Sequence, residues 1–475
     1  MKHIYLLLLS ALLLLASCLG DDNSNLTYYD DTAITAFSLG TLKRTMHTTS
    51  SEGEDSTYTV SLSASGYYFY IDQDACEIYN PDSLPIGTDN SKVVCTITSK
   101  NSGVIVIKNI DSDTLNYYSS SDSIDFSSPR EIRAYSLSAL YYRAYTVSVN
   151  VHQEDSTEFN WGQIDTETDI FDDVQGMRAI NKDGRIYVFC SDGTGTMAYY
   201  TEVDDGADWV SVELDSKIAG SAEAYENMQL KGDTIYIMCS DGTIMRSADA
   251  ETWETMAVAP IDKLVGYGGE QYLYGLSDDG IMISDDNGLT WSLDLHDDDV
   301  QYLPTEDVYC FMKDLATNEQ TSRVILVGSR SYDDYPSDTI GVTWSKIEEY
   351  ADNSQTHSWI YHDTSDYSSQ ILPRMSNMAV VYYGDGLLAM GGAGVGDGNN
   401  EEAFEVMYSS TDLGLSWQEE DYFAFPDDFD KTATCVGAAV DDDNYLWIVC
   451  GGTGQIWRGK LNKYAWTDYE TSFTK

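Results

Sequence analysis

Short apolar runs separated by polar turns dominate this chain, and from about residue 158 one pattern of them returns. The repeated unit is an apolar strand, a turn of small residues, a second strand, an Asp-rich turn and a Trp. Its strand-plus-turn part occurs six times, at residues 186–193, 235–242, 272–280, 324–329, 387–392 and 446–452. Runs bounded by Gly, Ser and Asp predict strands, and a period of roughly 40 to 50 residues suits four-stranded propeller blades. We therefore predict a β-propeller over residues 158–475.

The tryptophans support this repeat and leave one question open. A Trp follows each copy and is expected to open a later strand: Trp209, Trp253, Trp291, Trp344, Trp417 and Trp466. Trp161 precedes the first copy instead. It either opens an outer strand that pairs with the C-terminal blade and closes the ring, or it belongs to a seventh, poorly marked blade. We favour six blades.

A separate all-β domain is predicted before the propeller, over residues 28–155. Its short strands alternate with Ser, Asp and Gly turns, and the last of them, Tyr145–Val151, alternates with period two. No helical stripe of useful length occurs in this stretch. About 125 residues with strands at this spacing are typical of an Ig-like β-sandwich.

The N-terminus has the features of a lipoprotein export signal over residues 1–17. Lys2 and His3 precede an apolar run of about twelve residues, which is shorter than the roughly twenty needed to span a bilayer. The run ends in Leu15-Ala16-Ser17-Cys18, which resembles a lipobox, so Cys18 is the predicted lipidation site. Residues 18–27 would form an acidic tether. An ordinary signal peptide with a chance cysteine is the alternative.

Net charge excludes some partners, and cysteine number limits disulfides. The chain carries 26 Lys and Arg against 79 Asp and Glu, for a formal charge of −53, so it repels polyanions and no nucleic-acid partner is expected. Seven cysteines remain besides Cys18, an odd number that cannot pair completely. Cys76 and Cys95 share the N-terminal domain, and the sequence leaves open whether they form a disulfide.

Two octapeptides are similar to the Asp-box of neuraminidase-type repeats, Ser-x-Asp-x-Gly-x-Ser/Thr-Trp. Their matching residues are Ser284, Asp286, Gly288 and Trp291 in the first and Ser410, Asp412, Gly414 and Trp417 in the second. The Asp can accept hydrogen bonds from the N–H groups of its own turn, and the Gly supplies a left-handed backbone position. The Trp packs between sheets. We interpret these boxes as folding elements rather than catalytic sites.

The whole mature chain resembles a family of Bacteroidota lipoproteins that pair an Ig-like N-terminal domain with a propeller of neuraminidase-type repeats. The stretches that carry this resemblance are residues 31–42, 78–88, 145–153 and 454–463. The resemblance implies the two-domain architecture and a place on the outer membrane, exposed at the cell surface. It implies no reaction.

Candidate chemistry is sparse. A sialidase needs three arginines converging on a carboxylate, and none of the propeller arginines lies in that family's Arg-Ile-Pro motif. His357 and His362 flank Trp359 at a spacing that would put the two imidazoles on opposite faces of a strand, and the acidic clusters lack an EF-hand spacing. We assign no catalytic residue, no metal site and no cofactor.

The remaining hypotheses concern binding. Trp359 lies outside the Trp repeat, in a polar insertion, and is the predicted ligand-contacting residue. The favoured function is that of a lipid-anchored, non-catalytic binding or scaffold protein whose propeller presents a surface to a glycan or a protein partner. The alternative is a glycoside hydrolase or lyase that uses paired carboxylates.

Overall fold

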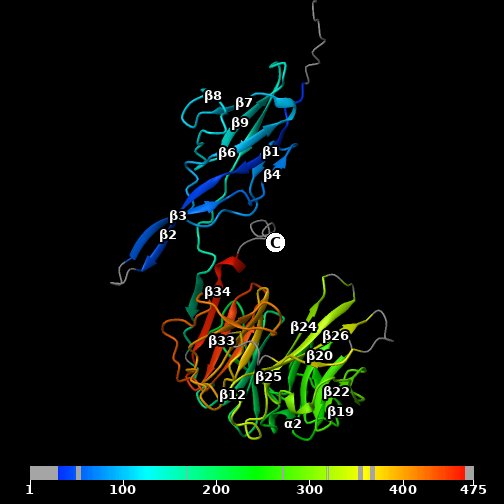
Figure 1. Ribbon diagram of the computed structural model, residues 1–475. Coiled ribbons are helices and arrows are strands. Elements are labelled where there is room, and N and C mark those ends of the chain that lie inside the picture. Colours follow the sequence, from blue (N-terminus) through cyan, green and yellow to red (C-terminus); the bar gives the residue numbers. More distant parts are fainter. Residues whose placement is uncertain are drawn as a thin grey trace, which may run out of the picture. The chain divides into compact units, whose positions relative to one another are not determined.

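A computed structural model describes residues 30–49, 55–166, 168–269, 272–316, 318, 320–350, 357–363 and 370–465. The chain divides into two compact units, the first ending at Asp155 and the second spanning Ser156–Ala465 (Figure 1). Both are built almost wholly from strands. The short helix α2 (Ser216–Ala219) and three 3-10 turns, Lys100–Ser102, Val300–Tyr302 and Asn462–Tyr464, are the helical elements of the described ranges. None of the described helices has the length and apolar character to cross a membrane.

The second unit consists of six four-stranded antiparallel sheets, which we number as blades 1 to 6. Blade 1 is β12 (Gly176–Lys182), β13 (Arg185–Ser191), β14 (Thr196–Glu202) and β15 (Val210–Val212). Blade 2 is β16 (Met228–Lys231), β17 (Thr234–Met238), β18 (Thr243–Ser247) and β19 (Glu254–Val258). Blade 3 is β20 (Lys263–Gly268), β21 (Tyr272–Ser277), β22 (Gly280–Ser284) and β23 (Ser292–Leu293).

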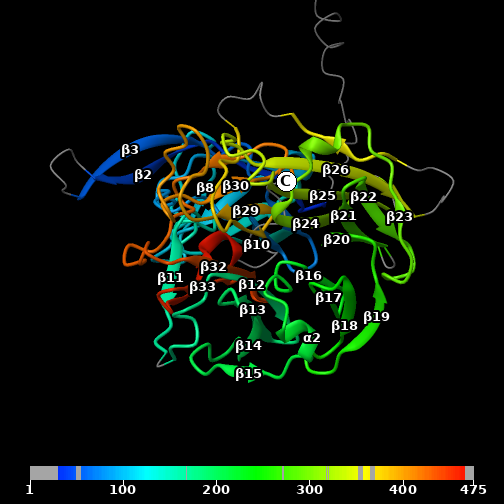
Figure 2. The same cartoon turned by 90° about the horizontal axis from the view of Figure 1, so that it is seen from below.

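The other three blades follow the same order. Blade 4 is β24 (Glu306–Asp314), β25 (Thr321–Ser329), β26 (Val342–Glu349) and β27 (Ile360–Tyr361). Blade 5 is β28 (Ala379–Tyr383), β29 (Gly386–Met390), β30 (Tyr408–Ser410) and β31 (Gln418–Glu419). Blade 6 is β32 (Cys435–Val440), β33 (Leu446–Gly451), β34 (Ile456–Leu461) and, from the start of the unit, β11 (Phe159–Gln163). Figure 2 shows β12, β16, β20, β24 and β32 around the centre of the ring and β15, β19 and β23 at its rim.

The strand β11 closes the ring and settles the number of blades. It pairs with β34 across its whole length, with Trp161 opposite Gly459. A Cβ at position 459 would lie 2.3 Å from the Trp161 ring, so the glycine makes room for the indole. Trp161 also donates its Nε1–H to the carbonyl oxygen of Ala424. The prediction of six blades, with Trp161 in the closing outer strand, is confirmed.

The repeated Trp marks the start of the outer strand, and the structure corrects one assignment. Trp209, Trp253, Trp291 and Trp417 each come directly before the outer strand of their blade. In blade 4, however, Trp344 lies inside the third strand, and Trp359 comes directly before β27. Trp359 therefore occupies the repeat position, and its description as a residue outside the repeat is wrong. Trp466 lies outside the described residues.

The first unit is an all-β domain around one apolar core. Its largest sheet has the order β4 (Tyr70–Asp72), β5 (Glu77–Tyr79), β10 (Tyr142–Val147), β9 (Arg130–Tyr135), β7 (Ile105–Lys108) and β8 (Leu115–Tyr117). β1 (Ile34–Leu39) pairs with β6 (Cys95–Ser99), and β2 (Thr41–Thr49) pairs with β3 (Asp55–Ser63) as a long hairpin arm. Side chains of β1, β6 and the large sheet share the core. Cys76 and Cys95 are free thiols.

Candidate functional site

The innermost strands of all six blades start at the same end of the central channel, and we call this end the channel mouth. This follows from the repeat, because every blade places its first strand on the channel axis and its fourth at the rim, in the same up-and-down order. The first residues of the inner strands and the loops between second and third strands therefore share one face. The Asp-box turns join third and fourth strands, so they lie on the opposite face.

A charged cluster fills the channel mouth. Glu226 precedes β16, and its carboxylate accepts hydrogen bonds from Lys263 Nζ at 2.8 Å and from the hydroxyl of Tyr225 at 3.2 Å. Burial alone would raise the pKa of Glu226, but the Lys263 ammonium outweighs it, and the pKa lies below its usual value. The Glu226 carboxylate and the Lys263 ammonium group thus pair with each other. A Cβ at position 176 would lie 1.9 Å from the Tyr225 hydroxyl, so the glycine leaves room for this side chain.

Asp307 is the second carboxylate at the mouth, and its backbone is strained. Its φ is +48°, a left-handed value for a residue with a side chain, at a bulge in the pairing of β24 with β25. Its Oδ2 accepts hydrogen bonds from the Tyr332 hydroxyl at 2.8 Å and from the backbone N–H of Met378 at 3.1 Å. Burial raises the pKa of Asp307, and burial likewise raises the pKa of its neighbour Glu306.

Two buried arginines, Arg178 and Arg374, form hydrogen bonds to backbone carbonyl groups. Arg178, 8% exposed, donates to the carbonyl oxygen of Val308 and stacks over the ring of Tyr309. Arg374, 0% exposed, donates to the carbonyl oxygens of residues 330, 335 and 338, which belong to the loop between β25 and β26. Neither guanidinium is free to bind a substrate carboxylate in the bidentate manner that a sialidase requires.

The space left at the channel mouth is very small. Residues of blades 1, 2, 4, 5 and 6 enclose a cavity of about 20 Å³, which is room for about one water molecule. Pockets that bind sugars and other small molecules measure roughly 300 to 1,000 Å³. The mouth therefore holds carboxylates, tyrosines and arginines of the types that glycosidases use, but the cavity that these described residues enclose is too small for a sugar ring.

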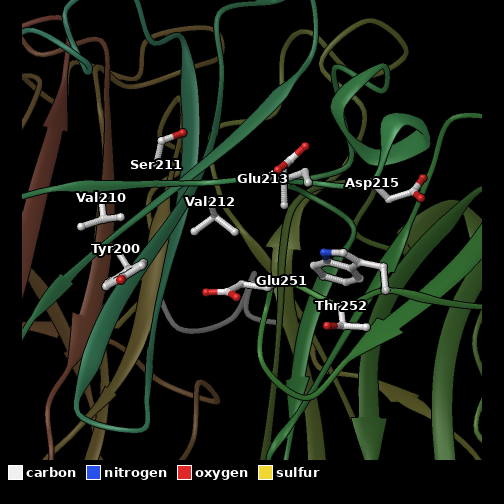
Figure 3. Close-up of a pocket in the computed structure, with 10 residues that line it drawn as sticks. Tyr200, Val210, Ser211, Val212, Glu213, Asp215, Glu251 and Thr252 are labelled. Atoms are coloured by element: carbon white, nitrogen blue, oxygen red, sulfur yellow. The ribbon is translucent and has the colours of Figure 1, made fainter.

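A larger groove lies between the outer parts of blades 1 and 2, and we call it the rim groove (Figure 3). Its volume is about 590 Å³. It is lined by Tyr200, by residues 210–215 of β15 and the segment after it, and by Glu251, Thr252 and Trp253 from the turn before β19. β15 has only three residues and is an edge strand, so the side chains beyond it are left open to solvent. The groove is thus lined by half-buried aromatic side chains on one part and by exposed carboxylates on another.

The lining of the rim groove suits a neutral polyhydroxylated ligand. Glu213 and Glu251 are exposed, and their carboxylate oxygens accept hydrogen bonds, which matches hydroxyl donors. Asp215 is already engaged, because it caps α2 by accepting from the Lys217 N–H at 2.9 Å. Tyr200 and Trp253 contribute apolar faces with polar edges. An anionic ligand would meet like charge here.

On the opposite face, the two Asp-boxes have equivalent hydrogen bonds. Asp286 Oδ1 accepts from the backbone N–H groups of Leu289 at 3.0 Å and Thr290 at 2.8 Å, and Ser284 Oγ accepts from the Gly288 N–H at 2.7 Å. Burial opposes ionisation of Asp286, but these hydrogen bonds outweigh it and lower its pKa. Trp291 donates to the carbonyl oxygen of Gly288. Asp412, Ser410, Gly414 and Trp417 repeat the same bonds.

Two further turns have the same Trp hydrogen bond to a turn carbonyl group, although their sequences do not match the Asp-box motif. In the turn Ser247–Trp253, Asp249 accepts from the N–H groups of Glu251 and Thr252, and Trp253 donates to the carbonyl oxygen of Ala250. Trp209 donates to the carbonyl oxygen of Gly206 in the same way. Ala250 has φ +64° and stands where the motif has a glycine. The signal available in the sequence was the Asp four residues before the Trp.

We expect Asp286→Ala to destabilise the propeller. The change removes the acceptor for two turn N–H groups, and each hydrogen bond contributes about 0.5 to 1.5 kcal/mol net. Thermal melting measures the effect. The neighbouring Asp285→Ala is the control, because Asp285 is exposed, and it should melt like the wild type. Equal melting of both variants would contradict the structural role of Asp286.

Trp359 does not contact solvent, and the prediction that it contacts a ligand is wrong. Its side chain is 0% exposed, and its Nε1–H donates to Asp294 Oδ2 at 2.9 Å. Its ring packs edge-on against Tyr274 at a centroid distance of 5.1 Å. The residue lies in an insertion by sequence, but the fold uses it as the blade 4 equivalent of the repeat Trp.

The two histidines considered from the sequence have different surroundings. His362 contacts the Ser345 hydroxyl at 2.7 Å, while His357 lies 3.7 Å from Glu349. Burial raises the pKa of Cys190 to about 12, so this thiol stays protonated. Within the part of the chain that the structure describes, no group of three His, Cys, Asp or Glu side chains could hold a metal ion. Cys18, the signal segment and the acidic tether lie outside the described residues.

The fold defines an all-β protein in which a six-bladed propeller follows a separate N-terminal unit. Residues 155–469 match the family model described as the DUF6242 β-propeller domain, and residues 37–149 match the DUF6242 N-terminal domain, a domain of unknown function. The chain belongs to the DUF6242 family. No match is found among curated proteins.

Several solved propeller structures are similar to the chain at low identity. The α-L-arabinofuranosidase Arb93A from Fusarium graminearum is 14% identical over 64% of this chain and 98% of its own, with a TM-score of 0.40. YCF48 from Cyanidioschyzon merolae is 11% identical over 64% and 99%, with a TM-score of 0.32. The sialidase from Trypanosoma rangeli is 11% identical over 64% and 58%, with a TM-score of 0.34.

Proposed function

We propose that the protein is a non-catalytic binding protein that holds a neutral glycan in the rim groove of its propeller. The observation that carries this proposal is the contrast between the two candidate sites. The channel mouth leaves about 20 Å³, whereas the rim groove measures about 590 Å³ and combines aromatic side chains with exposed carboxylates. A groove of that size lies within the range of small-molecule sites.

The strongest rival is a glycoside hydrolase or lyase that works at the channel mouth. One observation favours it: burial raises the pKa of Asp307, while Lys263 lowers the pKa of Glu226. Two carboxyl groups whose pKa values are shifted in opposite directions are typical of a catalytic acid and base. Their contacts speak against it, because Glu226 is bound to Lys263 and Asp307 to Tyr332 and Met378. The cavity beside these two carboxylates, at about 20 Å³, would also have to enlarge to admit a sugar.

A panel of neutral oligosaccharides and polysaccharides tests the proposal, assayed for binding and for hydrolysis. We expect binding without turnover, and we expect the double variant Glu213→Ala/Glu251→Ala to lose about tenfold or more in affinity, because hydrogen bonds to charged groups contribute about 1.5 to 3 kcal/mol. The control, Glu419→Ala/Asp421→Ala, removes two exposed carboxylates from the rim of blade 5. Turnover abolished by Asp307→Asn would establish the enzyme instead, and equal binding by both double variants would exclude the rim groove.

We further propose that the protein is a Bacteroidota lipoprotein, anchored through a lipid on Cys18 and exposed at the outer membrane surface. The lipobox-like segment Leu15–Cys18 and the acidic residues after it support this location. In this arrangement the N-terminal unit, for which we retain the proposal of an Ig-like sandwich, separates the membrane from the propeller. A protein partner at the cell surface would be recognised by its co-purification with the anchored chain.

We expect Cys18→Ala to abolish membrane association. The substitution removes the thiol that would carry the lipid, and each CH₂ group of a lipid chain buried in the bilayer contributes about 0.8 kcal/mol to binding. Fractionation of cells that express the wild type and the variant measures the effect, with Cys76→Ala as the control. If Cys18→Ala still sediments with membranes, the lipobox assignment fails.

A further inference from the structure

The turn between β9 and β10 exposes an unusual group of apolar side chains. Leu137, Leu140, Tyr141 and Tyr142 are 45%, 77%, 57% and 52% exposed. The eight residues from Tyr135 to Tyr142, which we call the β9–β10 tip, contain no charged side chain, although 22% of the chain is charged. Arg133 and Arg143 flank the tip on both sides.

Hydrogen bonds within the tip direct its apolar side chains outward. The Ser136 N–H donates to the Tyr141 carbonyl oxygen at 2.9 Å, and the Ser136 hydroxyl accepts from the Tyr141 N–H at 3.3 Å. Ala139 has a left-handed backbone, with φ +59°. Ser136 therefore satisfies polar groups of the turn itself. Tyr142 packs against Tyr135, at a centroid distance of 5.2 Å, and still leaves half of its surface exposed.

The tip lies beside the point where the described chain begins. The Ser138 hydroxyl donates to Asp30 Oδ1 at 2.7 Å, and the next residue, Asp31, pairs with Lys100 at 2.7 Å. In Figure 1 the start of β1 and the turn after β9 lie at the same end of the N-terminal unit, and the β2–β3 arm leaves from the other end. Asp30 follows Cys18 by twelve residues, a length of chain that spans at most about 40 Å.

We propose that the β9–β10 tip is a membrane-contact surface that inserts its leucines and tyrosines into the interface of the bilayer to which Cys18 is attached. This inference rests on the proposed lipid anchor. Tyrosine is favoured at membrane interfaces because its ring is apolar and its hydroxyl is polar. The exposed leucines supply apolar area, and the tip adds no negative charge of its own that anionic lipids would repel. The contact would hold the N-terminal unit in a fixed orientation on the membrane.

The test uses the full lipidated chain reconstituted into vesicles of phosphatidylethanolamine and phosphatidylglycerol. A Leu140→Cys variant carries an environment-sensitive fluorophore, and a Thr59→Cys variant, labelled in the same way on the exposed β2–β3 arm, is the matched control. Both also carry Cys76→Ser, because Cys76 is the half-buried free thiol among otherwise buried ones. We expect a blue shift of the label at position 140 and its quenching by spin-labelled lipids, with neither effect at position 59.

Each outcome decides one of the two proposals. If the protein sediments with vesicles but the label at position 140 stays in water, the membrane contact is overturned and the anchor stands. If the label is blue-shifted without quenching by the spin-labelled lipids, a protein neighbour covers the tip, and the lipid surface is also overturned. If the unlabelled chain with Cys18 intact fails to associate with membranes, the anchor itself fails, and the contact with it.

Discussion

Trp359→Ala is expected to unfold the propeller more readily than any other single change considered for this chain. The side chain is fully buried in the core that blades 3 and 4 share. Removing a buried large aromatic side chain costs about 3 to 5 kcal/mol, because contacts are lost and a cavity remains. The change also removes the indole donor to Asp294 Oδ2, which then keeps its bond to Lys346 Nζ at 2.7 Å. Thermal melting should show a large decrease in stability.

Two companion variants separate the causes of that loss. Trp359→Phe keeps an aromatic ring and loses the hydrogen bond, so it should lie between wild type and Trp359→Ala. Ile360→Ala alters the next residue, which is 47% exposed, and changes at such sites usually stay within about 0.5 kcal/mol. If Trp359→Ala melts like Ile360→Ala, the buried position of Trp359 is refuted and a role in ligand contact is open again.

The sequence allowed the propeller and its number of blades to be predicted, because these depend on local pattern. Each blade is specified by apolar alternation and by turns whose Asp and Gly satisfy the backbone nearby, so a period of matching segments predicts matching sheets. Trp161 could likewise be placed in the closing strand because it preceded the first repeat. Nothing in this reasoning required knowledge of contacts between distant residues.

The burial of Trp359 could not be predicted, because it depends on contacts between residues that are distant in the sequence. In the sequence, the spacing of Trp344 fits the blade period better, so Trp344 was assigned to the repeat position. In the structure, the connection before β27 is longer, and the Trp that precedes the outer strand is Trp359, fifteen residues after Trp344. Its burial depends on Asp294, which is 65 residues away. The channel mouth was missed in the same way, since Glu226, Lys263 and Asp307 come from three different blades and no spacing connects them.

Glu348→Gln is expected to stabilise the protein above neutral pH and to change little in acid. Glu348 is 5% exposed; its Oε2 accepts from the Tyr350 hydroxyl at 2.8 Å, and its Oε1 is buried without a hydrogen-bond partner. Burial raises its pKa from 4.5 to about 7. The folded protein therefore binds this proton more tightly than the unfolded chain. The contribution of this proton to the free energy of unfolding is complete below pH 4.5 and is lost as the pH rises through about 7.

The size of this effect follows from the shift, since each pKa unit corresponds to about 1.4 kcal/mol and the total is about 3 kcal/mol. Glutamine carries no charge at any pH, so the gain of Glu348→Gln over wild type should grow between pH 5 and pH 8 when melting is measured at both. Tyr350→Phe provides the matched test, because it removes the hydroxyl that stabilises the carboxylate and should lower stability more at pH 8 than at pH 5. Parallel pH profiles for wild type and Glu348→Gln would mean that Glu348 is already ionised at pH 5 in the folded protein, and that water or a cation satisfies its second oxygen.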